Sequence, residues 1–250
     1  MNERISVLGV NFKMYMDRNE TISWLNKVKI GLEQLDINHW EIFILPSAPL
    51  IPESIEICSG TSIKIGAQNT ASDMKGAFTG EISSKILKDV GCEYVLVGHH
   101  ERRSIFNESD IIANQKIKNA LHNNLIPIIC VGERIKEDIA QAKIEIESQL
   151  KIALNQVNEQ FRHVIAYEPT WAIGADQPAT FEHINEMGKF IHSILKSLNY
   201  QKYSLIYGGS AGFGQYAEIA DVCDGLFLGR SVHDPSQFLK VMKECAELKK

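Results

Sequence analysis

Eight short apolar runs are spread along the whole chain, and no other feature constrains its fold as strongly. Each run is a nearly continuous stretch of Val, Ile and Leu, without a regular alternation of apolar and polar residues. Strands with this pattern are covered on both faces, which is typical of parallel sheets. The predicted strands are Ile5–Val10, Glu41–Leu45, Ile63–Gly66, Tyr94–Val97, Ile126–Val131, Val164–Tyr167, Ser204–Tyr207 and Gly225–Leu228.

The segments between these runs show the 3.6-residue period of amphipathic helices. Their other faces carry Asp, Glu and Lys, as expected if one side packs on the sheet and the other meets water. One predicted apolar face comprises Ile135, Ile139, Ala142, Ile146, Leu150, Ala153, Leu154 and Val157. Another comprises Phe181, Ile184, Met187, Ile191, Ile194, Leu195 and Leu198.

The number of strand–helix units fits a closed barrel. Eight units in 250 residues give about 31 residues each, which matches the size of a (β/α)8 barrel. Without any linker-like or low-complexity stretch, residues 1–250 are expected to form one such domain. A doubly wound open sheet has the same alternation but commonly fewer strands. In a barrel, function resides at the carboxyl ends of the strands.

Composition excludes several classes of partner and compartment. The net charge is −5, so the chain lacks the basic field that would bind nucleic acid or an anionic membrane. Five dispersed cysteines without a C-x-x-C pair argue against a disulfide framework and a structural zinc site, and favour a reducing cytoplasm. With no long apolar segment, the protein is expected to be neither secreted nor embedded in a membrane.

Polar residues follow the first and fourth predicted strands. Asn11 and Lys13 are two residues apart and therefore point to the same side; Lys13 is either solvated, held against an anion, or a Schiff-base nucleophile. His99 stands where a helix begins, a position that favours a neutral imidazole able to donate a hydrogen bond. His99, His100 and Glu101 lack the spacing of a metal motif, and a solvated helix cap is the alternative.

The sixth predicted strand is followed by Glu168 and then by an unusual loop. A carboxylate beside apolar residues can acquire the raised pKa of a general base; an ion-paired glutamate at a strand end is the alternative. The apolar segment Trp171-Ala172-Ile173 lies between two prolines. Because exposing such a segment to water costs free energy, it is expected to close over a site as a lid.

Glycine-rich turns follow the last two strands, as Tyr207-Gly208-Gly209-Ser210 and Leu228-Gly229-Arg230-Ser231. Barrels commonly hold phosphate at these turns through backbone N–H groups. Arg230 could add charge-assisted hydrogen bonds. The alternative is that the glycines only serve tight turns.

Together these segments resemble the triosephosphate isomerase family, nearly over the whole chain and in the family's order. The resemblance implies an isomerase of ketose and aldose phosphates without metal or organic cofactor, most simply one that interconverts dihydroxyacetone phosphate and D-glyceraldehyde 3-phosphate in glycolysis and gluconeogenesis. The matching stretches are Asn11–Met14, Gly66–Asn69, Gly76–Glu81, Tyr94–His99, Glu101–Arg103, Tyr167–Pro169, Trp171–Gly174 and Tyr207–Ser210.

The resemblance also implies roles for the residues of the reacting centre. Glu168 would move a proton between adjacent carbons, and neutral His99 would donate to the carbonyl oxygens. Asn11 and Lys13 would stabilise the charge of the enediolate and the phosphate, with Glu101 paired to Lys13.

The resemblance further implies a phosphate site, a lid and a partner subunit. The lid would extend from Pro169 to Ala179 and be stabilised by Trp171 and Tyr207. The phosphate ligands would be the backbone N–H groups of Gly174, Ser210 and Gly229, with the Arg230 side chain as a further candidate. A homodimer would form through Gly76, Phe78 and Thr79.

Departures from the family's pattern keep alternatives open. The family usually has serine where this chain has His100, and glycine where it has Arg230. Pro178 fixes one φ near the end of the lid. These changes allow a four-carbon ketose phosphate, an erythrulose or tetrulose phosphate, as substrate. A lysine Schiff-base aldolase or lyase and a non-catalytic sugar-phosphate-binding barrel are the remaining alternatives.

Overall fold

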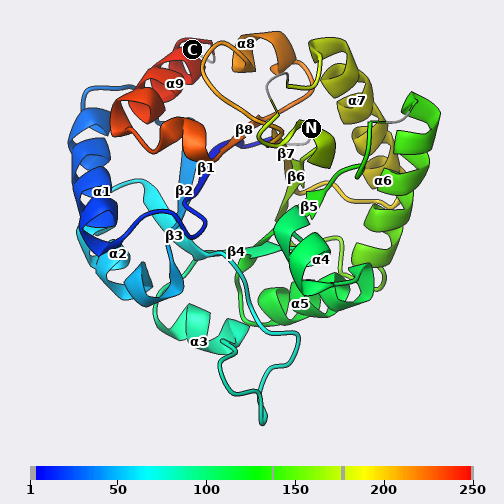
Figure 1. Ribbon diagram of the computed structural model, residues 1–250, viewed down its shortest axis with the longest axis horizontal. Coiled ribbons are helices and arrows are strands. Elements are labelled where there is room, and N and C mark those ends of the chain that lie inside the picture. Colours follow the sequence, from blue (N-terminus) through cyan, green and yellow to red (C-terminus); the bar gives the residue numbers. More distant parts are fainter. Residues whose placement is uncertain (1–3, 137, 176–177, 249–250) are drawn as a thin grey trace.

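The structure is a computed structural model that describes residues 4–136, 138–175 and 178–248. Eight parallel strands pair in sequence order, and β1 also pairs with β8, so the sheet closes into a barrel with helices around it (Figure 1). The predicted (β/α)8 barrel is confirmed, and each predicted strand ends within one residue of the observed one. The strands are β1 Ser6–Asn11, β2 Trp40–Leu45, β3 Ile63–Ala67, β4 Tyr94–Val97, β5 Ile126–Val131, β6 His163–Tyr167, β7 Tyr203–Tyr207 and β8 Gly225–Leu228.

The helices cover the outside of the barrel. Most begin at a side-chain cap; for example, the Ser109 side chain accepts a hydrogen bond from the backbone N–H of Ile112, which satisfies one of the free N–H groups of the first turn. The α-helices are α1 Arg18–Leu32, α2 Ile51–Cys58, α3 Ser84–Asp89, α4 His100–Phe106, α5 Asp110–His122, α6 Ile139–Ala153, α7 Phe181–Ser197, α8 Tyr216–Ile219 and α9 Pro235–Leu248. Short 3-10 turns η1 Ala48–Leu50, η2 Thr170–Ala172 and η3 Arg230–Val232 join them.

The prediction that Ile135 belongs to the apolar face of a helix was wrong. Helix α6 starts at Ile139 because the Asp138 side chain accepts hydrogen bonds from the N–H groups of Ala140 and Gln141 and caps the helix there. Ile135 therefore lies before the helix and is 60% exposed. Among the described residues, no helix has the length and apolar character required to cross a membrane.

The core has two parts, separated by the barrel wall. An inner cluster that includes Val7, Phe43 and Phe227 fills the barrel, and a larger outer cluster packs between the strands and the helices. Gly9 makes room for the inner cluster, since a β-carbon there would meet the Phe43 ring at 2.1 Å. Side chains of the inner cluster therefore fill the barrel interior between the strands.

Candidate active site

Side-chain alternation along the strands decides which residues face the barrel axis. On β6, Val164 and Ala166 belong to the inner cluster and Ile165 and Tyr167 to the outer one. The next residue, Glu168, therefore points inward, as does Asn11 two positions after Gly9 on β1. The same parity brings Gly208, after β7, next to Glu168, where a β-carbon would lie 2.9 Å from the Glu168 Cγ.

A cavity of about 330 Å³ lies at the carboxyl ends of the strands. Every predicted catalytic and phosphate-binding residue lines it, whereas Tyr207 and Trp171 do not. The predicted residues in its lining are Asn11, Lys13, His99, Glu101, Glu168, Gly174, Ser210, Gly229 and Arg230.

Lys13 stands in a strained loop that neighbouring residues hold in place. Its φ is +51°, a left-handed conformation that costs a non-glycine residue about 1–2 kcal/mol. The Asn11 side-chain oxygen accepts the Lys13 N–H at 2.9 Å, and Gln68 Nε2 donates to the Lys13 carbonyl at 2.8 Å. The Lys13 ammonium lies 2.8 Å from Glu101 Oε1. The cation is thus directed into the cavity by contacts from three separate segments of the chain.

His99 is held as one neutral tautomer. Its Nδ1 accepts the backbone N–H of Glu101 at 3.3 Å, in the first turn of α4, so the ring proton is placed on Nε2. Burial, together with His100 and Lys13, keeps the pKa of His99 well below its ordinary value. The Nε2 atom lies 3.8 Å from Glu168 Oε1, too far for a hydrogen bond. The Nε2–H group can therefore serve an oxygen of a bound molecule.

Glu168 is a buried carboxylate with the properties of a base. It is 5% exposed, and burial raises its pKa to about 7, partly offset by the Cys130 thiol and the Lys13 ammonium. A carboxylate with a pKa near neutrality can both take and return a proton at physiological pH. A buried carboxylate and a neutral imidazole donor thus face the same small space.

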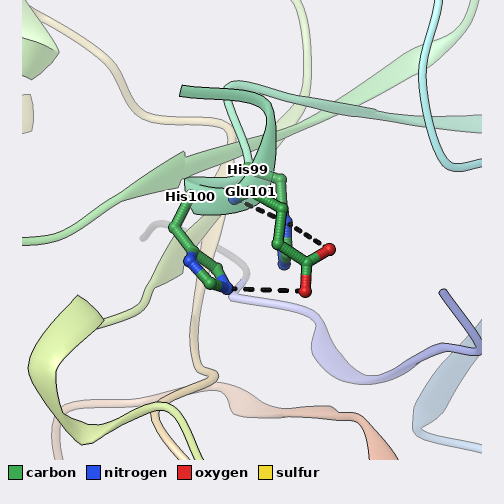
Figure 2. Close-up of side chains that lie close together, drawn as sticks. All are labelled: His99, His100 and Glu101. Carbon is green, nitrogen blue, oxygen red and sulfur yellow. Dashed lines mark hydrogen bonds and ion pairs between the residues drawn. The ribbon is translucent and has the colours of Figure 1, made fainter. Parts of the chain in front are cut away.

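Three potential metal ligands, His99, His100 and Glu101, also meet in this region, and Figure 2 shows their side chains side by side. Their ligand atoms lie within 4.8 Å of one another. Two of the groups already have partners, because His99 Nδ1 accepts a backbone N–H and Glu101 pairs with Lys13. A metal ion would have to compete with the Lys13 ammonium, so this geometry does not favour a metal centre.

Residues 169–175 of the predicted lid are hydrogen-bonded to the turn after β7. Ser210 Oγ donates to the Ala172 carbonyl at 2.7 Å and accepts the Gly174 N–H at 2.8 Å. The Ser210 N–H donates to the Gly208 carbonyl at 3.1 Å. A phosphate bound by the N–H of Gly174 or Ser210 would therefore replace an internal hydrogen bond. The lid residues 176 and 177 lie outside the described residues.

The first residues of the predicted lid contact a buried carboxylate, Glu133. It is 0% exposed and accepts hydrogen bonds from Trp171 Nε1 at 2.9 Å and from the Tyr167 hydroxyl at 3.2 Å. His183 Nε2 lies 2.8 Å from the same carboxylate. At the other end of the lid, the Tyr207 hydroxyl donates to the Gly209 carbonyl and takes a backbone hydrogen bond from Ala179.

Arg230 occupies the rim of the cavity beside the lid. A β-carbon on Gly174 would lie 3.0 Å from Nη2 of Arg230, and the guanidinium carbon lies 5.9 Å from the centre of the Tyr15 ring. Both Arg230 and Tyr15 line the cavity. The rim next to Gly174 therefore carries a positive side chain, which suits an anionic group.

Comparison with known proteins places this barrel in a family. The family model described as triosephosphate isomerase matches residues 6–245. The chain belongs to the triosephosphate isomerase family. It is 37% identical to an L-erythrulose-1-phosphate isomerase of Pectobacterium atrosepticum, with 99% of this chain and 98% of the relative covered. It is 39% identical to a triosephosphate isomerase of Aquifex aeolicus, with 94% and 98% covered.

Sequence reasoning had missed two residues of the site in this family member. Glu133 stands two positions after β5 and Gln68 directly after β3, so both occupy the strand-end positions where barrel sites lie. Gln68 was predicted only as part of a stretch that resembles the family, and no prediction covered the end of the fifth strand. A position just after a strand is the sequence signal for both residues, whereas the partners of Glu133 have no local signal.

Proposed function

We propose that this chain is an aldose–ketose isomerase that moves a carbonyl group between adjacent carbons of a phosphorylated sugar through an enediolate. The observation that carries the proposal is the pair of Glu168 and His99, a buried carboxylate with a pKa of about 7 and a neutral imidazole donor 3.8 Å away. Family membership supports it. Dihydroxyacetone phosphate and D-glyceraldehyde 3-phosphate are the main proposed substrate pair.

In the proposed reaction, Glu168 removes a proton from the carbon next to the carbonyl and returns it to the former carbonyl carbon. His99 Nε2–H donates to the oxygens on these two carbons in turn, and the hydroxyl proton passes from one of these oxygens to the other. The Lys13 ammonium and the Asn11 amide offset the negative charge that develops. A positioned base supplies roughly 10²–10⁴-fold, and one preorganised oxyanion donor roughly 10²–10³-fold, so the groups must act together.

The phosphate is proposed to bind at the rim formed by the lid and the turns after β7 and β8. The supporting residues are Gly174, Ser210 and Gly229 with their backbone N–H groups, and the Arg230 guanidinium. Closure of the lid over the substrate excludes water from the enediolate. Trp171 and Tyr207 are proposed to hold the lid at its two ends through the contacts described above.

Replacing Glu168 by Gln tests the isomerase proposal. The variant keeps the volume of the side chain but cannot take a proton, so kcat/KM on D-glyceraldehyde 3-phosphate is expected to fall by at least about 10³-fold. A sugar-phosphate-binding barrel would show no turnover in the wild type and unchanged binding in the variant. Trapping of Lys13 by borohydride in the presence of substrate would instead reveal a Schiff-base enzyme.

A four-carbon ketose phosphate is the second candidate substrate. A specific observation favours it, since a relative matching almost the whole chain is named L-erythrulose-1-phosphate isomerase. The side chains of His100 and Arg230 in the cavity lining are consistent with a changed pocket. Measuring kcat/KM on three- and four-carbon phosphates under the same conditions decides between the two.

We further propose a cytoplasmic homodimer, and a place in glycolysis and gluconeogenesis if triose phosphate is the substrate. The five cysteines are free and buried, which suits a reducing compartment. The segment between β3 and α3 projects away from the barrel (Figure 1), and Phe78 on it is 47% exposed. Gly76 and Thr79 lie two positions before and one position after Phe78 in the sequence. Sedimentation of the wild type and of Phe78→Asp tests the interface, since the charge should produce monomers.

A further inference from the structure

We infer that His100 determines substrate specificity by binding a hydroxymethyl group on the carbon that Glu168 deprotonates, so that the site accepts a four-carbon ketose 1-phosphate in addition to the triose phosphate. This inference rests on the proposed isomerase function and specifies its substrate. It concerns the reacting end of the substrate, not its phosphate.

His100 is grouped with the residues of the reacting centre. It is the first residue of α4 and lines the cavity. The centre of its ring lies 4.6 Å from that of His99, and its Nε2 lies 3.8 Å from Glu101 Oε1 (Figure 2). Arg230, by contrast, lies on the side of the cavity formed by Tyr15 and Gly174, with its guanidinium carbon 5.9 Å from the centre of the Tyr15 ring. A substrate with its phosphate at Arg230 and its carbonyl at His99 therefore presents its reacting carbons to the side of the cavity that holds His100.

The His100 Nε2 atom can form a hydrogen bond with a polar group of a ligand. It is buried and has no hydrogen-bond partner among the described residues, although 20% of the side chain is exposed. Burial and the nearby Lys13 ammonium lower the pKa of His100, so the ring stays neutral and can bond a hydroxyl group. His163 also has unpaired ring nitrogens, but it is 0% exposed within the core and does not line the cavity.

The chemistry of the two substrate lengths places the additional group at this end. In a ketose 1-phosphate, the atoms from the phosphate to the carbonyl carbon are the same for three and for four carbons. The four-carbon compound differs by a hydroxymethyl group in place of one hydrogen on C3, the carbon that loses its proton. The carbonyl then moves from C2 to C3 as Glu168 carries the carbon-bound proton from C3 to C2. The hydroxyl proton passes from the oxygen on C3 to the oxygen on C2, both of which His99 Nε2 faces, so no other reactant is needed. A ketose 4-phosphate would instead lengthen the segment between the carbonyl and the phosphate, away from His100.

The test compares wild type, His100→Ser and His100→Gln with dihydroxyacetone phosphate and with each enantiomer of erythrulose 1-phosphate. For His100→Ser, kcat/KM on the preferred erythrulose 1-phosphate is expected to fall by about tenfold or more, the effect of leaving one polar group unpaired. The value on dihydroxyacetone phosphate should change less than about threefold. His100→Gln keeps a long polar side chain and should restore part of the four-carbon activity. Arg230→Gly is the matched control, since both substrates share the phosphate and the ratio of their activities should not change.

The outcomes separate this inference from the proposed function. If His100→Ser and His100→Gln both fold, as judged by circular dichroism, and leave the ratio of the two activities unchanged, the role of His100 is refuted. If the wild type isomerises the triose phosphate and neither enantiomer of erythrulose 1-phosphate, the inference fails and the isomerase proposal stands. If the wild type isomerises neither, the proposed function itself is wrong.

Discussion

Gly208 is the position where the smallest possible substitution should disturb catalysis. A β-carbon there would lie 2.9 Å from both Cγ and Oε1 of Glu168, and 3.3 Å from its Cδ. Gly208 is not among the residues with positive φ, so its φ does not require glycine. The expected effect of Gly208→Ala is therefore a displaced Glu168 side chain within an otherwise unchanged fold.

The size of this effect follows from the contact distances. Carbon atoms pack without strain at about 3.5–4.0 Å, so the Glu168 carboxylate must move by roughly 0.5–1 Å. Misplacing a reacting group by about 1 Å can cost 10²-fold in rate. We expect kcat of Gly208→Ala to fall by about 10²-fold, equivalent to about 2.7 kcal/mol in the activation barrier. The change in KM should be much smaller, because the three atoms nearest the added β-carbon all belong to Glu168.

The assay is steady-state kinetics on D-glyceraldehyde 3-phosphate with a matched glycine control. Gly212 follows the same strand and lies outside the cavity lining, and a β-carbon there would have its nearest contact at 4.0 Å, with Ser231 Cβ. Gly212→Ala should therefore keep the wild-type kcat. A folded Gly208→Ala variant with kcat within about twofold of the wild type would refute the claim that this contact positions the base.

Three further predictions follow from the buried polar groups. Because the pKa of Glu168 is raised to about 7 and the base must be ionised, kcat/KM should fall about tenfold per pH unit below that value, and a flat profile from pH 5 to 8 would contradict its role. Trp171→Phe removes the 2.9 Å hydrogen bond to Glu133 and should lower kcat/KM by about 10-fold or more if the bond holds the lid; an unchanged value would mean that it does not. Burial lowers the pKa of His163 to about 4. Between that pH and about 6.5, this histidine is therefore protonated in the unfolded chain and neutral in the folded chain. The free energy of unfolding should decrease by about 3 kcal/mol in total as the pH falls through this range. In urea titrations, His163→Leu should lack this part of the decrease.

The strands were predictable from the sequence because burial on both faces leaves a local signature. A run such as Ile126–Val131 is apolar at almost every position, and this can be recognised without knowing the rest of the sequence. The helices were predictable for the same reason, from their apolar period. The error at Ile135 arose because an apolar residue at the right spacing extends a pattern, whereas the helix begins where Asp138 caps it.

The sequence predicted residues that line the cavity, but it did not predict the contacts between them. Strand-end positions indicated Lys13, His99 and Glu168, because in a barrel these ends share one face. The same reasoning did not reach Glu133, whose importance comes from the donors that surround it. Those donors lie up to 50 positions away in the sequence, so no local pattern could pair them.

By itself, the sequence determined the succession of strands and helices and the chemical types that stand at the strand ends, since both depend on neighbours within a few positions. Only the tertiary structure decided how these groups meet. Closure of the barrel brings Lys13 to 2.8 Å from Glu101, 88 positions along the chain, and buries Glu168 so that its pKa rises to about 7. The distances between these groups and the desolvation of Glu168 depend on residues that are far apart in the sequence. Both are therefore set only when all eight strands have paired.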